Sequence, residues 1–359
     1  MAKTKKTPEQ NDITLNDTEG KYKKFYQGTI TNSATAISKK TKPVKKTENS
    51  VTYDLAGKTE GSVILTNPTE NELSLASSQL MDVITIYLTE KLPHNASDES
   101  LTKFLNCKLP VETYMKSRGL SDKNQAVKEM KKDLETLFNI RMIAETKRMA
   151  PRKNRTTGEV TFRKVTEKMA IRVIDAKPDG EIRDYAHFHI ALSFARYLVH
   201  SQIMAYPLPI LLTAKNKNIY YIGKKLAEHY NINQFKAKRK TDKNYISISA
   251  LLEYTPEIPT FEEEQLRGRH YRQKCIEPLE KTLDALVDLG VVSKWHFTNA
   301  KKKALSDDDI SKYSVSFDEW KERLLYFDLK DYPNLKQKKQ LDEKNKQPTL
   351  GLFDDEMLE

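Results

Sequence analysis

The sequence predicts an α+β fold with two tandem copies of one helix-and-hairpin unit, and three observations support this prediction. One apolar ladder occurs twice at an offset of 149 residues, as Val127, Met130, Leu134, Leu137 and Ile140 and then as Ile276, Leu279, Leu283, Leu286 and Leu289. The spacing within each ladder is that of one face of a helix. Each ladder also runs into a short apolar strand, and a turn-rich, lysine-rich stretch follows that strand.

A helix followed by a strand, a polar turn and a second strand is the plan of a winged helix, a small fold that most often binds DNA. A chain of 359 residues is long enough for two such domains and two tails. We therefore expect a disordered basic arm over residues 1–60, an N-terminal winged helix over 62–210, a C-terminal winged helix over 215–330 and a disordered tail over 331–359.

The overall charge narrows the class of partner. Lysine and arginine total 61 against 50 acidic residues, so the net charge is +11, which favours a polyanion such as nucleic acid or an anionic membrane face. The alternative is a lysine-rich protein from an AT-rich genome without such a partner. Cys107 and Cys275 show no pairing pattern and no metal-ligand spacing, which suits a reducing cytoplasm. We expect a soluble, cytoplasmic protein, because no signal peptide and no apolar stretch of about 18 residues occurs. We also expect no cofactor and no metal.

The first unit is expected to begin near Ser62. Its predicted elements, in chain order, are a helix over 73–88, a short helix over 109–115, the ladder helix over 122–138, a strand over 140–146, its return over 160–174, a strand over 182–192 and a helix over 193–203. The turn between the strands that follow the ladder is rich in cations and is expected to form a wing tip with Arg148, Arg152, Lys153, Arg155 and Gly158.

The second unit follows the same plan. Its predicted elements are a helix over 219–230, a basic loop with Lys236, Lys238, Arg239 and Lys240, a short helix over 246–252, the second ladder helix, a hairpin with strands over 291–297 and 313–317, a wing tip with Lys301, Lys302 and Lys303, and a terminal helix over 317–326. Pro278 lies inside the second ladder, where it either starts a new helix or kinks a longer one.

The residues in front of each ladder distinguish the two copies. A recognition helix contacts bases with its first turns while flanking cations hold phosphates. The second copy has six suitable donors there, namely Arg267, Arg269, His270, Arg272, Gln273 and Lys274. The first copy has a thinner set, which acidic residues dilute (Glu129, Asp133 and Glu135). We therefore expect the second copy to read DNA and the first to support assembly into a homodimer, with auxiliary contacts from Arg152, Lys153 and Arg155. The alternative is an ordinary solvated helix face over 267–274.

The succession of two winged helices, each with a long helix that runs into a hairpin, resembles the replication initiators of theta-replicating bacterial plasmids. The match covers residues 70–330 and includes the early proline of Ile276-Glu277-Pro278-Leu279 in the reading helix. The resemblance implies dimerisation through the N-terminal winged helix and binding of directly repeated origin sites by the C-terminal one. It also implies help in opening the adjacent duplex and recruitment of host replication proteins. The long basic arm, and the segment between Leu252 and the second ladder, depart from that pattern.

A peptide in the tail provides a second functional signal. Gln347, Leu350, Leu352 and Phe353 resemble the Q-x-x-L-x-L-F peptide by which bacterial replication proteins bind the sliding clamp. A flexible segment can present three apolar anchors to a groove, and the glutamine can add directional hydrogen bonds. The alternative is a tail that packs back on its own domain.

Two other classes of function remain open. His187 and His189 flank one apolar residue on a predicted strand, and Tyr221 lies downstream on a helix, as in rolling-circle endonucleases that use a histidine-bound metal and a nucleophilic tyrosine. Because histidines spaced in this way are also common on half-buried strands, we expect no catalytic residues. A winged-helix transcriptional regulator without a replication role is the remaining alternative, and the tail peptide distinguishes it from an initiator.

Overall fold

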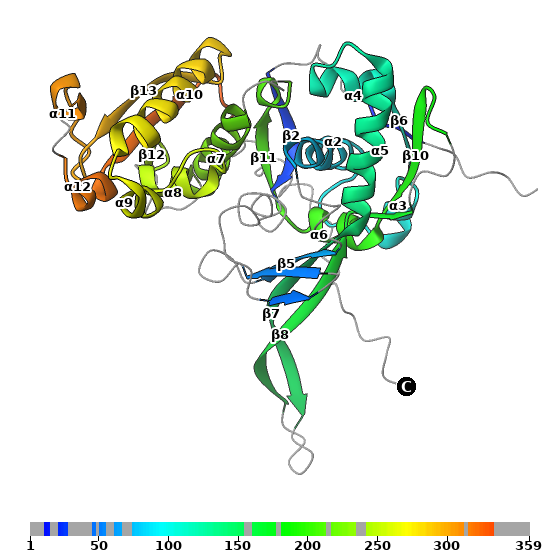
Figure 1. Cartoon of the computed structure of the whole chain (residues 1–359). Helices are drawn as coiled ribbons and strands as arrows, with labels where there is room; N and C mark the ends of the chain where they lie inside the picture. Colours follow the sequence, from blue (N-terminus) through cyan, green and yellow to red (C-terminus); the bar gives the residue numbers. More distant parts are fainter. Residues whose placement is uncertain are drawn as a thin grey trace, which may run out of the picture.

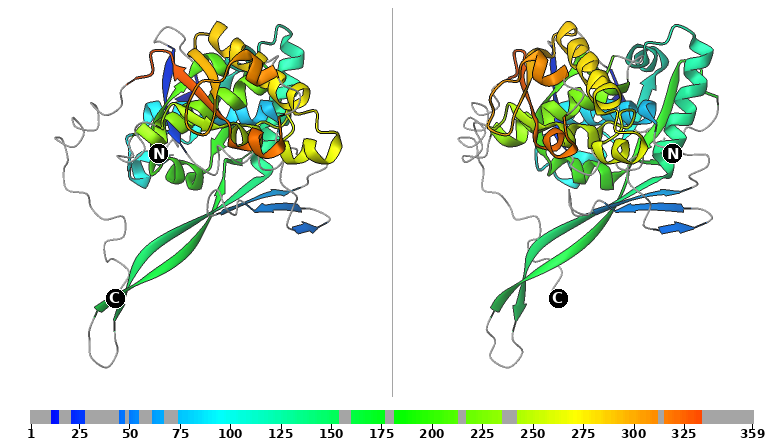
Figure 2. Two further views of the ribbon diagram at one scale, coloured as in Figure 1. Left: turned by 90° about the vertical axis from the view of Figure 1, so that its left-hand side faces the viewer. Right: turned by 60° about the vertical axis from the view of Figure 1, so that its left-hand side comes forward.

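The structure, a computed structural model, describes residues 11–14, 21–27, 45–47, 50–54, 61–66, 74–153, 160–176, 181–212, 217–234, 242–311 and 315–333. Within these segments the fold is α+β, with four small β-sheets, and a long two-stranded hairpin projects from the body (Figures 1 and 2). None of the described helices combines the length and the apolar character that a membrane span requires.

The described chain begins with five strands, and helices and strands follow in mixed order. The first elements are β1 (Asn11–Asp12), β2 (Tyr22–Gln27), β3 (Lys45–Thr47), β4 (Ser50–Asp54), β5 (Gly61–Thr66), α2 (Leu75–Lys91), α3 (Asp98–Thr102), β6 (Asn106–Pro110), α4 (Val111–Arg118), α5 (Lys123–Asn139), β7 (Ile140–Lys153), β8 (Val160–Arg172), β9 (Ile174–Ala176), β10 (Tyr185–Ile190), α6 (Leu192–Val199) and β11 (Gln202–Pro207). The later elements are α7 (Lys217–Gln234), β12 (Tyr245–Ser247), α8 (Ile248–Tyr254), α9 (Phe261–Arg267), α10 (Glu277–Asp288), β13 (Val292–Thr298), α11 (Asp307–Ser311), α12 (Phe317–Glu322) and β14 (Leu324–Leu329).

Three strands of the four-stranded sheet β1-β6-β10-β9 repeat the order of the three-stranded sheet β12-β14-β13. In the first, β6, β10 and β9 are neighbours in that order, and both pairs are antiparallel. In the second, β12, β14 and β13 are neighbours, again with both pairs antiparallel. In each set of three the middle strand, β10 or β14, comes last in the chain. The ladder helix, α5 or α10, lies in the chain between the other two strands. The sequence repeat therefore corresponds to a repeat of topology, with the β7–β8 hairpin inserted in the first copy and α9, α11 and α12 in the second.

The apolar ladders are confirmed as buried helix faces. The fully buried members are Met130, Leu134 and Leu137 in α5 and Leu279, Leu283 and Leu286 in α10. They belong to one hydrophobic core that continues through both copies. Burial of each such side chain contributes about 1.5–3 kcal/mol to folding, so the ladders anchor both helices.

The predicted disordered arm differs from the structure wherever residues 1–60 are described. The strand β2 pairs with β11, and its Phe25 and Tyr26 are buried in the core. The Tyr26 hydroxyl donates to the Leu92 carbonyl oxygen at 2.9 Å. Strand β1 pairs with β6, and β4 pairs with both β3 and β5. A few apolar residues within a lysine-rich segment are enough to form edge strands, so the first copy begins before Ser62.

The hairpin predicted after the first ladder is present, but it does not join the sheet to which a wing would belong. Arg152 and Lys153 lie at the outer end of β7, which pairs with β8 and β5 in a five-stranded sheet rather than with β6 and β10. The position of a wing, between the last two strands of the β6-β10-β9 sheet, belongs instead to the connection between β9 and β10. The sequence does not distinguish the two hairpins, β7–β8 and β9–β10, because both follow α5 in the chain.

The second hairpin returns later than predicted. The strand that pairs with β13 is β14, Leu324–Leu329, whereas residues 317–322 form the short helix α12. Alternation in β14 explains the difference, because Leu325, Phe327 and Leu329 face the core while the residues between them are half-buried. The predicted terminal helix is therefore present but ends at Glu322, and the strand β14 occupies the rest of the predicted range.

Pro278 occupies the second position of α10, directly after a π-helical turn over Arg272–Ile276. In that turn the Glu277 amide donates to the Arg272 carbonyl oxygen, five residues earlier. Proline has no amide hydrogen, and its ring crowds the carbonyl four residues before it. The wider turn relieves this conflict, so one helix continues from Tyr271 to Asp288.

A buried ionic network joins the two copies. The Lys224 ammonium of α7 donates to Asp82 Oδ1 of α2 at 2.6 Å, and the hydroxyls of Tyr206 and Tyr220 donate to Asp82 Oδ2 at 2.9 and 2.7 Å. Asp82 is 1% exposed and Lys224 6% exposed. The pKa values of Tyr206 and Tyr220 are raised well above the ordinary value, mainly by burial and secondly by the negative charge of Asp82. Both tyrosines therefore remain protonated and act as hydrogen-bond donors.

Candidate nucleic-acid interface

A three-residue turn joins α9 to the helix that carries the second ladder. The helix α9 begins with a capping box, in which Thr260 Oγ1 accepts from the Glu263 amide at 3.1 Å and Glu263 Oε2 accepts from the Thr260 amide at 2.7 Å. Glu264 is buried and closes the turn, because its Oε1 accepts from the His270 amide at 3.0 Å. Arg269 adopts a left-handed conformation with φ of 61°. Two helices with such a short connection form a helix–turn–helix arrangement.

Five of the six predicted DNA donors at this turn are exposed, namely Arg267, Arg269, His270, Gln273 and Lys274. Arg272 differs from them. Its Nη1 donates to Glu280 Oε1 at 2.7 Å, its Nε lies 3.8 Å from Glu277 Oε1, and its side chain is only 22% exposed. Arg272 therefore holds the start of the helix, and the other five are available to a ligand.

Acidic side chains lie toward the other end of the same helix. Asp284 and Asp288 are exposed, and Trp295 Nε1 of β13 donates to Asp284 Oδ1 at 3.1 Å. Because β13 leads back along the helix from this contact, its last residue, Thr298, lies about 10 Å toward the helix start at Tyr271, which itself lies about 20 Å before Asp284. The turn after β13 thus lies toward the cationic end of the helix.

That turn carries the three predicted wing lysines. The Asn299 side-chain oxygen accepts from the amides of Lys301 and Lys303 at 3.0 and 3.1 Å, which shapes the turn. Lys301 and Lys303 are exposed, whereas Lys302 pairs with Asp242 and lies 4.8 Å from the centre of the Tyr245 ring. Lys301 and Lys303 are therefore exposed on this turn, and Lys302 holds the turn to the body through Asp242.

The first copy presents a more cationic helix than its sequence indicates. Asp133 is buried and accepts from the Tyr114 hydroxyl at 2.6 Å, and Glu129 pairs with Arg118 and Gln125. Asp133 and Glu129 therefore do little to offset the positive charge on the outer face of α5. The exposed side chains of α5 are cationic or amide-bearing, namely Lys123, Asn124, Gln125, Lys128, Lys131 and Lys132.

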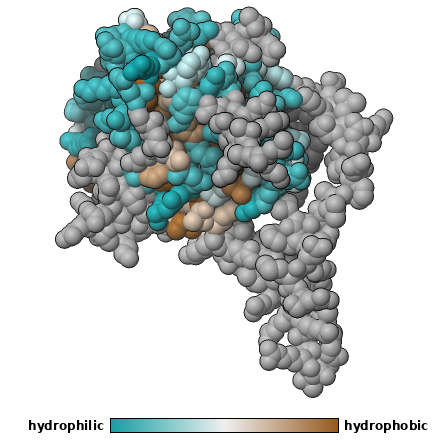
Figure 3. Space-filling model, turned by 90° about the vertical axis from the view of Figure 1, so that its right-hand side faces the viewer, coloured by the Kyte–Doolittle hydropathy of each residue, from teal (hydrophilic) through white to brown (hydrophobic). Residues whose placement is uncertain are grey.

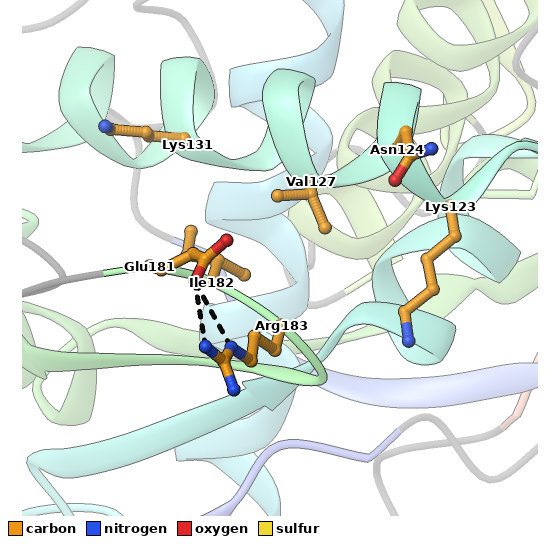
Figure 4. A pocket seen from close by; sticks show the side chains of 7 residues that line it. All are labelled: Lys123, Asn124, Val127, Lys131, Glu181, Ile182 and Arg183. Carbon is orange, nitrogen blue, oxygen red and sulfur yellow. Dashed lines mark hydrogen bonds and ion pairs between the residues drawn. The ribbon is translucent and has the colours of Figure 1, made fainter.

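A hollow of about 480 Å³ separates α5 from the segment before β10. Lys123, Asn124 and Val127 extend from the helix toward Glu181 and Arg183 (Figure 4). Arg183 Nε and Nη2 donate to Glu181 Oε2 at 3.2 Å each. Figure 3 views this side of the molecule and shows a mostly hydrophilic surface. The hollow thus combines a cationic helix with the connection that stands in the position of a wing.

The buried carboxyl of α5 gives a prediction about pH. Replacing Asp133 by asparagine is expected to raise the free energy of unfolding by about 2–3 kcal/mol at pH 7 and to change it little near pH 4. Burial raises the pKa of Asp133 to about 6 from 3.8, although the hydrogen bond from Tyr114 opposes the shift. Between these values the folded protein binds more protons than the unfolded chain, so stability falls as the pH rises.

Urea unfolding of the parent protein and of Asp133→Asn at pH values from 4 to 7 measures this difference, because the asparagine oxygen still accepts from Tyr114 without titrating. Parallel curves for the two proteins across this range would contradict the assignment.

The residues of the nicking alternative lie apart. His187 and His189 are on the outer side of β10, where Asp175 is 3.7 Å from His189. Tyr221 is buried on α7 beside Leu75 and Tyr220. In Figure 1, β10 and α7 lie on opposite sides of α2. In the part of the chain that the structure describes, no three histidine, cysteine or acidic side chains come close enough to hold a metal.

Some predicted residues lie outside the described segments. These are Lys236, Lys238, Arg239 and Lys240 of the basic loop, Arg155, and Gln347, Leu350, Leu352 and Phe353 of the tail peptide. Sequence reasoning in turn missed Lys131 and Arg183 at the hollow. Lys131 was detectable, since it falls opposite the apolar ladder on a helical wheel. Arg183 was not, because its place beside α5 depends on tertiary packing.

Comparison with known proteins gives structural matches only. No protein-family model and no curated protein sequence matches this chain. A crystal structure of selenomethionine derivatives of domains 2 and 3 of RctB is 14% identical, covers 84% of this chain and 98% of its own, and has a TM-score of 0.38. A second structure of RctB domains 2-3 is also 14% identical, covers 80% of this chain and 94% of its own, and has a TM-score of 0.36. Such low similarity supports no inference about function, so the function is inferred from this chain's own residues.

Proposed function

We propose that this chain binds duplex DNA sequence-specifically through two tandem winged helices and starts replication at an origin without catalysing a reaction. The observation that carries the proposal is the repeated topology, with an exposed cationic helix start in each copy. A winged helix places such a helix in the major groove and its hairpin turn against the backbone. The shared strand order of the sheets β6-β10-β9 and β12-β14-β13 supports this assignment for both copies.

The second copy is the proposed principal reader. Arginine can pair with guanine in bidentate fashion and glutamine with adenine, so Arg269 and Gln273 are the proposed base contacts. Lys274, Lys301 and Lys303 supply phosphate contacts beside them. The pairing of Arg272 with Glu280 favours a positioning role for this arginine instead of base contact.

The first copy is proposed to contact DNA through α5 as well as to support a homodimer. The exposed lysines of α5 and the hollow beside Arg183 favour a larger share of the DNA contact than the sequence alone indicates. Dimerisation rests on the resemblance to plasmid initiators.

The replication role rests on that same resemblance and on the tail peptide. Its proposed partners are repeated origin sites, the bacterial sliding clamp and other host replication proteins. A transcriptional regulator needs no clamp contact. Retention of the full chain on immobilised clamp, lost in Leu352→Ala with Phe353→Ala, supports the replication role; equal retention of both proteins removes the peptide from it.

Selection from a randomised 40-base-pair duplex library tests the DNA-binding proposal. We expect one recovered sequence family that the full chain binds about 1,000-fold more tightly than a scrambled duplex of the same composition. The affinity should fall steeply as the salt concentration rises, because each phosphate contact releases counterions. Recovery of unrelated sequences with uniform affinity would contradict sequence-specific binding.

A further inference from the structure

The β7–β8 hairpin projects from the body in every ribbon view (Figures 1 and 2). It pairs continuously from Arg141 with Arg172 to Lys153 with Val160. The strand β5 covers β7 only from Ile140 to Ala144. Beyond that point, among the described residues, neither β7 nor β8 has another strand partner. We call residues 145–153 and 160–168 the ribbon.

A two-stranded ribbon without further partners adds little stability to a protein and increases its tendency to aggregate. Isolated hairpins are marginally stable in water, and their unpaired edges invite pairing with other chains. The outer part of the ribbon, residues 147–153 and 160–166, contains six lysines and arginines and no acidic residue. Its charge is therefore complementary to a polyanion, and at about 30 Å the ribbon is nearly as long as one turn of duplex DNA.

The register separates these cations by type. Residues directly opposite each other share a face, and alternate residues along a strand share a face. One face carries the arginines Arg148, Arg152 and Arg163, since Arg163 pairs with Ala150. The other face carries the lysines Lys147, Lys153 and Lys164, since Lys164 pairs with Met149. We call these the arginine face and the lysine face.

The two residue types suit two different contacts with DNA. Arginine presents a planar fork of donors that matches base edges, whereas lysine is a point charge suited to phosphates. The major groove is about 12 Å wide and admits a two-stranded ribbon. Every one of the six cations is opposite an uncharged residue in the register, so the ribbon carries no direct cation pair that would force its strands apart.

We propose that the β7–β8 ribbon is a DNA-binding arm that enters the major groove of a duplex with its arginine face toward the bases. This inference rests on the proposed function, because it extends the contact with the same duplex beyond the two helices. The arm would cover about one further helical turn beside the sequence that α10 reads.

Two variants with equal charge test the arm. Arg148→Gln, Arg152→Gln and Arg163→Gln remove three charges from the arginine face, and Lys147→Gln, Lys153→Gln and Lys164→Gln remove three from the lysine face. On the selected duplex, we expect the arginine variant to weaken binding about 100-fold and to shorten the hydroxyl-radical footprint by about one turn. It should also abolish interference by methylation of guanine N7 in that turn. The lysine variant should weaken binding less than about 10-fold and keep the footprint length.

Several outcomes overturn the arm while leaving the proposed function intact. Equal losses in both variants would mean that charge alone matters, and unchanged footprints in both would mean that the ribbon does not touch DNA. A shortened hairpin, in which Asn-Gly replaces residues 147–166, provides a further measurement. If it keeps the parent's footprint but changes a dimer into a monomer, the ribbon binds a second copy of the chain. If the parent protein protects no duplex at all, the proposed function and the arm both fail.

Discussion

Replacing Lys224 by methionine is expected to lower the free energy of unfolding by about 3–5 kcal/mol. Methionine has a similar length but no charge, so the Asp82 carboxylate would remain buried with only two tyrosine hydroxyls as partners. A buried unpaired charge is among the largest single destabilising effects in proteins. Because Asp82 belongs to the first copy and Lys224 to the second, the loss also weakens the contact between them. Urea unfolding monitored by circular dichroism measures the change.

Two further variants separate this effect from a general loss of charge. Lys217→Met removes an exposed lysine of the same helix, whose Nζ is 3.1 Å from Glu257, and should cost less than about 1 kcal/mol. Adding Asp82→Asn to Lys224→Met removes the unpaired charge and should recover part of the stability, since asparagine still accepts from a tyrosine hydroxyl. A loss in Lys224→Met no larger than that in Lys217→Met would contradict the role of the network.

The triple variant Arg267→Gln, Arg269→Gln and Lys274→Gln is expected to weaken specific DNA binding by at least about 100-fold. Removing one base or phosphate contact costs about 1–3 kcal/mol, and 1.4 kcal/mol corresponds to a factor of ten. All three side chains are exposed, so folding should change little. Fluorescence anisotropy with the selected duplex measures the loss.

A charge-matched control uses exposed lysines on other elements. Lys91→Gln, Lys103→Gln and Lys330→Gln remove the same net charge from α2, the end of α3 and the residue after β14. This control should weaken binding less than about 10-fold, since these lysines act only through the overall field. Equal losses in the two triple variants would remove the helix–turn–helix from the interface.

The repeat of apolar spacing predicted both ladder helices because helical periodicity is a local property of the sequence. The same spacing also indicates that Asp133, next to Leu134, falls on the inner side of α5. Asp133 is buried against Tyr114 and so takes no negative charge to the exposed face of α5. A count of the acidic residues along the ladder therefore underestimates how cationic that face is. The pairing of Glu129 with Arg118 depends on the packing of α4 against α5 and had no sequence signal.

The misplaced elements have a common physical cause. Strands β2 and β14 are defined by partners far along the chain, β11 and β13, and a lysine-rich or turn-rich local sequence hides them. The β7–β8 hairpin follows α5 directly, so the sequence predicts it to be the wing of the first copy, although β7 pairs with β5. Strand pairing is non-local, and residue patterns alone do not specify which hairpin joins which sheet.

Hydroxyl-radical footprinting of the full chain on the selected duplex tests the central claim most directly. We predict two protected segments, of which the variant Arg267→Gln, Arg269→Gln and Lys274→Gln loses one and a variant Lys128→Gln with Lys131→Gln loses the other. A single protected segment that both variants leave unchanged, or no protection above a scrambled duplex, would contradict a chain that reads DNA with two tandem winged helices.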